Sequence, residues 1–285
     1  MSTKREELLS RIYEIIKIST IPSILKKIME VTEDSNSSVS ELERVIEHDQ
    51  SIAARVVGIS NSVYYGFPRK INSISQAILV LGFEMVKGLA ISTAVFDVFD
   101  REKRPHIVSL WRHSFEVAMG SVLLAEKTGC VSRDSAFLAG LLHDIGRPIL
   151  YQIFGRQYLE VIGCDVHSLL SVEEETFGAA HPEAGSWFAD RCKLPESCVN
   201  SIRFHHNPEI YLSSVKTGKP SCLVPMVYLA DLVISEGNDC SGQFTIISPR
   251  HSDILRAANV DHAVLDDVKD TVKKMSVQLE GYFEY

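Results

Sequence analysis

Hydrophobic residues recur at intervals of three and four along almost the whole chain, and this spacing limits the fold more than any other feature. An early example is the stripe of Leu8, Leu9, Ile12, Ile15 and Ile16. Such spacing places apolar side chains on one face of a helix, and that face must be buried against other helices. The alternation typical of a half-buried strand is absent apart from the short run 243–247. The sequence therefore predicts an all-α protein.

Capping residues indicate where several helices begin and end. "SISQ" at 73–76 has the pattern of a helix start, and one apolar helix is expected to continue from it to Val95. Ser132 is a candidate cap for the helix that ends at His143 and Asp144. Gly129 is expected to close a helix that begins at Ser109.

A charged stretch that ends in proline and histidine, residues 97–106, interrupts the apolar pattern. We interpret it as a boundary between two packed helical subdomains, 1–100 and 101–285. No repeat or low-complexity tract accompanies it.

The charge and cysteine pattern excludes several classes of protein. Lys and Arg number 29 against 37 Asp and Glu, a net charge of −8, so a general nucleic-acid surface is not expected. No apolar run reaches the length of a membrane span, and the charged N-terminus does not have the pattern of a signal peptide. The 6 cysteines form no C-x-x-C pair, which is typical of reduced thiols. We expect a cytoplasmic protein that does not bind membranes.

Seven histidine and aspartate residues lie on or at the ends of helices with apolar faces. They are His113, His143, Asp144, His181, His205, His206 and Asp231. Each has a structural alternative when taken alone: a core histidine bonded to a carbonyl, a cationic helix end, or a salt-bridged aspartate. A carboxylate in a stretch as apolar as the one around Asp231 is costly unless it is paired or bound to a cation. If the helices pack as a bundle, the seven side chains can meet at one interior point.

Imidazole nitrogen together with carboxylate oxygen is a ligand set for Fe, Mn, Ni or Zn. We therefore predict one or two divalent transition metal ions, with an aspartate at the centre to bridge two of them. Two neighbouring ions could activate a water molecule and stabilise a phosphoryl leaving oxygen.

The order H…HD…H…HH…D resembles the HD-domain metal-dependent phosphohydrolase superfamily, close to its HD-GYP branch. It includes "HDIG" at 143–146 and "HH" at 205–206. Segments in both halves of the chain resemble the HDOD domain (HD-related output domain). They are "IPSILKKIMEV", "VIEHDQSIAARVVGISNSVYYG", "INSISQAILVLGFEMVKGLAIS", "LWRHSFEVA", "HPEAGSWFADRCKLPESCVNSIRFHH" and "LADLV". The resemblance covers about residues 12–235 and implies an all-α fold with an HD-like bundle in the C-terminal part.

The resemblance also implies a role in bacterial signalling. Most HDOD proteins are thought to be regulatory modules without metal ligands, whereas this sequence keeps all seven residues of the hydrolytic branch. It differs from that branch at Arg147, where lysine is usual, and in "HHNPEI", which lacks the GYP motif. Ser109 stands where three-metal members offer a glutamate, so at most two ions are expected.

The favoured hypothesis is a regulatory protein with a metal site, acting on signalling proteins in trans or sensing a small signal. The alternative is an active phosphodiesterase or phosphohydrolase on a nucleotide or cyclic dinucleotide. Asp144 and Arg147 would then be the candidate catalytic residues, with Arg147 contacting a phosphate of the ligand. A third possibility is a redox or oxygen sensor with a di-iron site.

Overall fold

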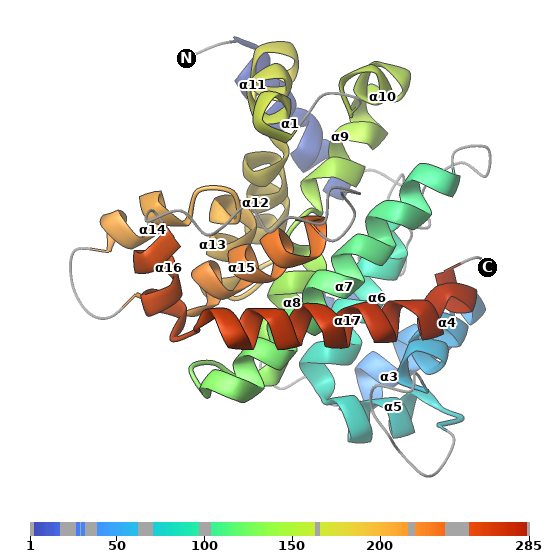
Figure 1. The fold of residues 1–285 in the computed structure, drawn as a ribbon. Coiled ribbons are helices and arrows are strands. Elements are labelled where there is room, and N and C mark those ends of the chain that lie inside the picture. Colours follow the sequence, from blue (N-terminus) through green and yellow to red (C-terminus); the bar gives the residue numbers. More distant parts are fainter. Residues whose placement is uncertain are drawn as a thin grey trace.

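A computed structural model describes residues 3–17, 27–28, 30–31, 39–61, 71–96, 104–162, 166–215, 220–236 and 251–283. Every regular element within these ranges is a helix (Figure 1). The prediction of an all-α protein is confirmed. The short run 243–247 lies outside the described residues.

The first part of the chain forms α1 (Thr3–Lys17), α3 (Val39–Glu47), α4 (Gln50–Ser60), α5 (Ile74–Leu81) and α6 (Phe83–Phe96). Helices α3 to α6 pack against one another. Ser73 caps α5 by accepting a hydrogen bond from the Gln76 backbone N–H, at 3.2 Å. The single helix expected from here to Val95 is wrong, because the chain breaks at Gly82, whose φ of 89° does not fit a helix.

The second part begins with the longest helix, α7 (Arg104–Thr128), and the remaining elements follow it. They are α8 (Arg133–Leu142), α9 (Gly146–Phe154), α10 (Arg156–Ile162), α11 (Val166–Phe177), α12 (His181–Arg191), α13 (Glu196–Phe204), α14 (Pro208–Ser214), α15 (Leu223–Glu236), α16 (His251–Ala258) and α17 (His262–Phe283).

Helix α7 starts earlier than the sequence suggested. The expected start at Ser109 is wrong, since Pro105 lies in the first turn, where a missing N–H costs nothing. Most of the expected boundary, residues 97–103, lies outside the described residues, and the division at 100/101 stays a prediction. Gly129 ends α7 with a φ of 62°, and Ser132 caps α8 through the Ser135 N–H, both as expected.

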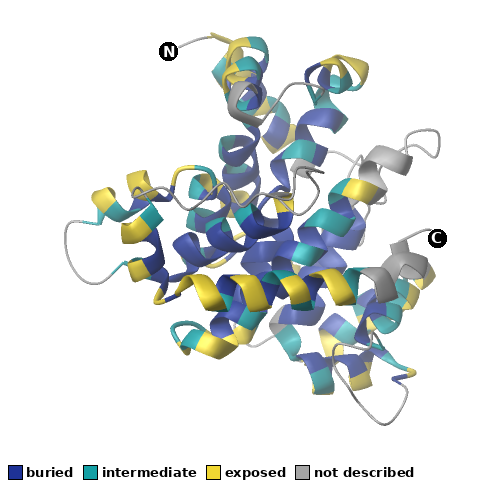
Figure 2. Ribbon diagram, viewed as in Figure 1, coloured by how far each residue is buried: buried dark blue, intermediate teal, exposed yellow. Residues whose placement is uncertain are grey.

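Helix α8 lies at the centre of the molecule. Its residues 136–142 are all buried, and Figure 2 shows buried residues concentrated where α8 meets its neighbours. Gly140 allows the backbones of α8 and α7 to approach closely, because a Cβ there would lie 2.7 Å from the Ala118 Cα. The end of this buried helix is where the HD pair lies.

Helix α1 packs against α9, α11 and α12, far along the chain from it (Figure 1). Its side chains Leu8 and Ile12 are fully buried in that contact region. Among the described residues, no helix has the length and apolar character needed to cross a membrane.

Candidate metal centre

Six helices and the turns at their ends bring the seven histidine and aspartate side chains to one place. His113 comes from α7 and Asp231 from α15, while His181 is the first residue of α12. The HD pair, His143 and Asp144, forms the tight turn between α8 and α9. The pair at 205–206 directly follows α13. Residues up to 118 positions apart in sequence, from 113 to 231, thus meet in one interior region.

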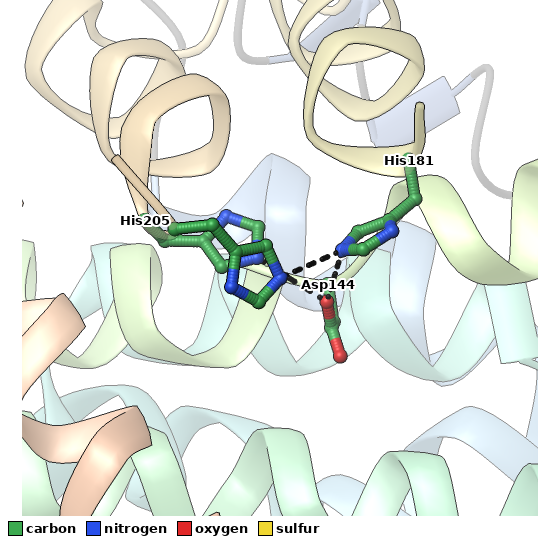
Figure 3. Close-up of side chains that lie close together, drawn as sticks. Asp144, His181 and His205 are labelled. Atoms are coloured by element: carbon green, nitrogen blue, oxygen red, sulfur yellow. Dashed lines mark hydrogen bonds and ion pairs between the residues drawn. The ribbon is translucent and has the colours of Figure 1, made fainter. Parts of the chain in front are cut away.

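The Asp144 carboxylate lies at the centre of this region. Its Oδ1 is 3.2 Å from His181 Nε2 and 3.4 Å from His205 Nε2, and Figure 3 shows both rings directed at it. Its Oδ2 is 3.2 Å from Arg147 Nε and 3.7 Å from His143 Nε2. The Arg147 contact is an ion pair without the alignment of a hydrogen bond. Asp144 therefore presents one oxygen to each of two groups of possible ligands.

The first group consists of Asp144, His181, His205 and His206, and the second of His113, His143 and Asp144. Within each group the candidate ligand atoms all lie within 4.8 Å of one another. Asp231 adjoins the second group, with its Oδ1 3.1 Å from His113 Nε2 and 3.9 Å from His143 Nε2. The arrangement has the form of two neighbouring sites that share one carboxylate.

The hydrogen bonds of the imidazole Nδ1 atoms determine what the Nε2 atoms can do. His143 Nδ1 lies 2.8 Å from the Gly140 carbonyl oxygen, and His205 Nδ1 lies 2.7 Å from that of Ile202. A carbonyl only accepts, so in both rings Nδ1 carries the proton and a neutral ring has an unprotonated Nε2. Both Nε2 atoms and Asp144 Oδ1 are buried without a hydrogen-bond partner. Lone pairs gathered in this way are stable only with a cation or added protons between them, so the residues fit a metal ion.

Burial and neighbouring charges shift the pKa values of these groups in different directions. Burial lowers the pKa of His143 to about 4 and that of His206 to about 2, so both rings are neutral ligands at neutral pH. Burial opposes ionisation of Asp144, but Arg147 and His143 hold its pKa well below the ordinary value. Burial also opposes protonation of His181, yet Glu173 and Asp144 raise the pKa of its ring above the ordinary value.

A buried carboxylate that the sequence analysis missed orients His181. Glu173 Oε2 accepts hydrogen bonds from the His181 backbone N–H at 2.8 Å and from its Nδ1 at 2.7 Å. Glu173 Oε1 accepts from the Tyr158 hydroxyl at 2.7 Å, and both Glu173 and Tyr158 are fully buried. A carboxylate behind a histidine fixes its tautomer and strengthens it as a ligand. The local signal was only one glutamate among three in "SVEEETF".

The glycine of the HDIG sequence permits the approach of α9 to α12. A Cβ at Gly146 would lie 1.9 Å from the His181 carbonyl oxygen and 2.9 Å from the Gly185 backbone nitrogen. Contacts this short are impossible for real atoms, so only glycine fits at position 146. The turn that carries Asp144 and the start of α12 that carries His181 are held together by this contact.

An all-α fold in which an HD turn meets histidines from three other helices defines an HD-type helical protein with a candidate dinuclear metal centre. The chain belongs to the HDOD family, whose domain model matches residues 18–208.

Comparison with known proteins agrees with this assignment. An HDOD domain protein of unknown function from Geobacter sulfurreducens has a similar structure, with a TM-score of 0.70, 26% identity and coverage of 98% of this chain and 99% of that chain. A relative from Treponema pallidum (strain Nichols), whose name assigns no function, is 26% identical over 215 residues. That alignment covers 70% of this chain and 40% of the relative.

Two more distant structures share the fold. A protein from Marinobacter aquaeolei VT8, provisionally named a signal transduction protein, has a TM-score of 0.72 at 19% identity. This chain is covered to 99% and that chain to 65%. A protein from Shewanella amazonensis SB2B, provisionally named a phosphohydrolase, has a TM-score of 0.69 at 20% identity, with coverage of 95% and 97%.

Replacing Glu173 with glutamine is expected to weaken metal binding. The substitution Glu173→Gln removes the charge that holds the Nδ1 proton of His181, and loss of such a partner costs about 10- to 100-fold in metal affinity. Titration of the metal-free protein with Zn²⁺ measures the effect. The exposed neighbour provides the control, since Glu174→Gln should leave the affinity unchanged. Equal affinities for the two variants would show that Glu173 does not support the centre.

Replacing Gly146 with alanine is expected to separate α9 from α12. The added Cβ has no space next to the His181 carbonyl, and such overpacking costs about 1–3 kcal/mol or more in unfolding free energy. Urea denaturation measures the stability, and metal content measures the centre. In the control Gly120→Ala, the nearest atom is the flexible end of Ile234 at 3.2 Å. If Gly146→Ala is as stable and as rich in metal as the control, the close contact is not required.

Proposed function

We propose that this protein is a signal-transduction regulator of the HDOD type whose centre holds one or two divalent transition metal ions. It acts through partner proteins in trans or in response to a small signal such as a nucleotide or phosphate ligand. Family membership supports the signalling role. The provisional name of the similar Marinobacter aquaeolei VT8 protein points in the same direction.

The ligand types present suit Fe, Mn, Ni or Zn. One ion would be held by Asp144, His181, His205 and His206, and a second by His113, His143, Asp144 and Asp231. The first set has more imidazole than carboxylate ligands, and the second has equal numbers of the two. Ca²⁺ and Mg²⁺ prefer oxygen ligands, so these sets disfavour them. A bound ion of this kind supplies Lewis acidity and lowers the pKa of a coordinated water.

The observation that carries the regulatory assignment is the position of Arg147. Its guanidinium lies against Asp144 Oδ2, and the neighbouring carboxylates raise its pKa further despite burial. Arginine keeps its proton at any physiological pH, so this side chain can bind an anion but is a poor proton donor. The centre thus offers a cation and an anion-binding group without an evident acid at this position, which favours binding over turnover.

The first test is the metal itself. Purified without chelator under reducing conditions, the protein is expected to contain a transition metal by elemental analysis. The double substitution His143→Ala and Asp144→Ala should abolish it, because it removes the shared carboxylate and a ligand of the second group. His262→Ala with Asp266→Ala, two exposed positions on α17, is the control and should keep the metal. A metal-free wild-type protein would contradict the proposed centre.

The alternative function is a phosphodiesterase. It is favoured by the two candidate metal sites that share Asp144, because two neighbouring ions can activate water and stabilise a leaving oxygen. A regulator is expected to show no turnover of nucleotide, phosphodiester or cyclic dinucleotide substrates when loaded with Mn²⁺ or Fe²⁺. Phosphate release or chromatography of the products measures this. Turnover that disappears in the His143→Ala and Asp144→Ala variant would overturn the regulatory assignment in favour of an enzyme.

A further inference from the structure

The segment from Glu173 to Glu183 determines where His181 lies, and it is held from two sides. On the inner side, Glu173 binds both the backbone N–H and the ring of His181. On the outer side, the segment is covered by helix α1, which lies near the N-terminus. The position of His181 therefore depends on two independent sets of contacts.

Helix α1 contacts this segment at both of its ends. The Lys4 ammonium donates to the Glu175 carbonyl oxygen at 3.1 Å, at the end of α11. The Arg5 guanidinium pairs with both carboxylate oxygens of Glu183, in the first turn of α12, and stacks over the Trp187 ring at 5.0 Å. A bidentate pair of this kind fixes orientation as well as distance.

Backbone packing makes the contact close. Gly178 lies between α11 and α12 with a φ of 94°, and a Cβ there would lie 2.7 Å from the Arg5 nitrogen. Further along α1, the helix is anchored on α9, where Arg11 donates to the Ile153 carbonyl oxygen at 2.9 Å. Helix α1 thus joins α9, which follows Asp144, to α12, which begins with His181.

Helix α1 lies outside the part of the chain that the HDOD family model matches. The helix ends at Lys17, and the match begins at residue 18. Its contacts with the segment from Glu173 to Glu183 therefore do not follow from the family match.

We propose that α1 is a positioning element for the centre: Arg5, acting through Glu183, holds the start of α12 so that His181 Nε2 faces Asp144. Displacement of α1 then weakens the group of Asp144, His181, His205 and His206 and leaves the group of His113, His143 and Asp144 largely unaffected. The proposal rests on the proposed metal centre.

The test uses the metal-free full-length protein and Co²⁺ as the probe, with affinity and visible absorption as readouts. His181→Ala and His113→Ala identify which binding event belongs to which group. Arg5→Ala is expected to weaken the His181 event about tenfold, the lower end of the effect of outer-shell partners. Glu183→Gln, which keeps the size of the side chain, should do the same. Arg5→Lys keeps one charged contact and should restore most of the affinity.

Stability is measured in parallel to separate positioning from general stabilisation. Lys127→Ala removes an exposed ion pair with Asp267 remote from the segment and is the control. If wild-type protein takes up no Co²⁺, the metal centre itself is wrong and the proposal fails with it. If wild-type protein binds Co²⁺ and Arg5→Ala binds it equally well, only the positioning role is wrong. Equal weakening of both events in proportion to lost stability would also overturn that role.

Discussion

Burial of the Asp144 carboxylate is the constraint on which the rest of the structure depends. An ionised carboxylate inside a protein costs several kcal/mol unless partners surround it. Arg147 supplies one partner, and His181 and His205 supply others at Oδ1. Because these partners come from α9, α12 and the end of α13, the helices can pack around α8 only in the arrangement that brings them together. The centre is thus part of the core and not an addition to it.

The helical nature of the chain and the identity of the clustered residues could be predicted, because both follow from local patterns. Apolar spacing indicates a helix, and histidine or aspartate in an apolar helix is costly enough to require a partner. Glu173 could not be found in this way, since it lies among exposed glutamates and only the packing of α11 buries it. The break at Gly82 was missed for a similar reason: the apolar pattern continues across it, and only the φ of 89° reveals it.

The two ligand groups differ in charge and in their surroundings. The first offers three imidazoles and the shared carboxylate, and Glu173 stands behind one of its rings. The second is joined by Asp231, whose carboxylate pairs with His113, and Arg147 lies against Asp144 Oδ2 on this side of the centre. Softer nitrogen-rich sites favour Zn²⁺ or Ni²⁺, whereas oxygen adds preference for Mn²⁺ or Fe²⁺. Two ions in the centre would therefore differ in affinity and need not be the same element.

A regulator needs a path by which events at the surface alter the site, and the positioning role proposed for α1 would supply one. A partner or ligand that favours a displaced α1 would lower the affinity of the centre for metal. By thermodynamic linkage, metal binding would then lower the affinity for that partner by the same factor. Such a partner shifts the equilibrium only through different contacts with the two positions of α1. Arg5 is well placed for this, because its ion pair with Glu183 is 30% exposed on the arginine side and open to competition from another carboxylate or phosphate. Metal binding at the centre and partner binding at the outer surface of α1 would then be coupled even if no substrate is turned over.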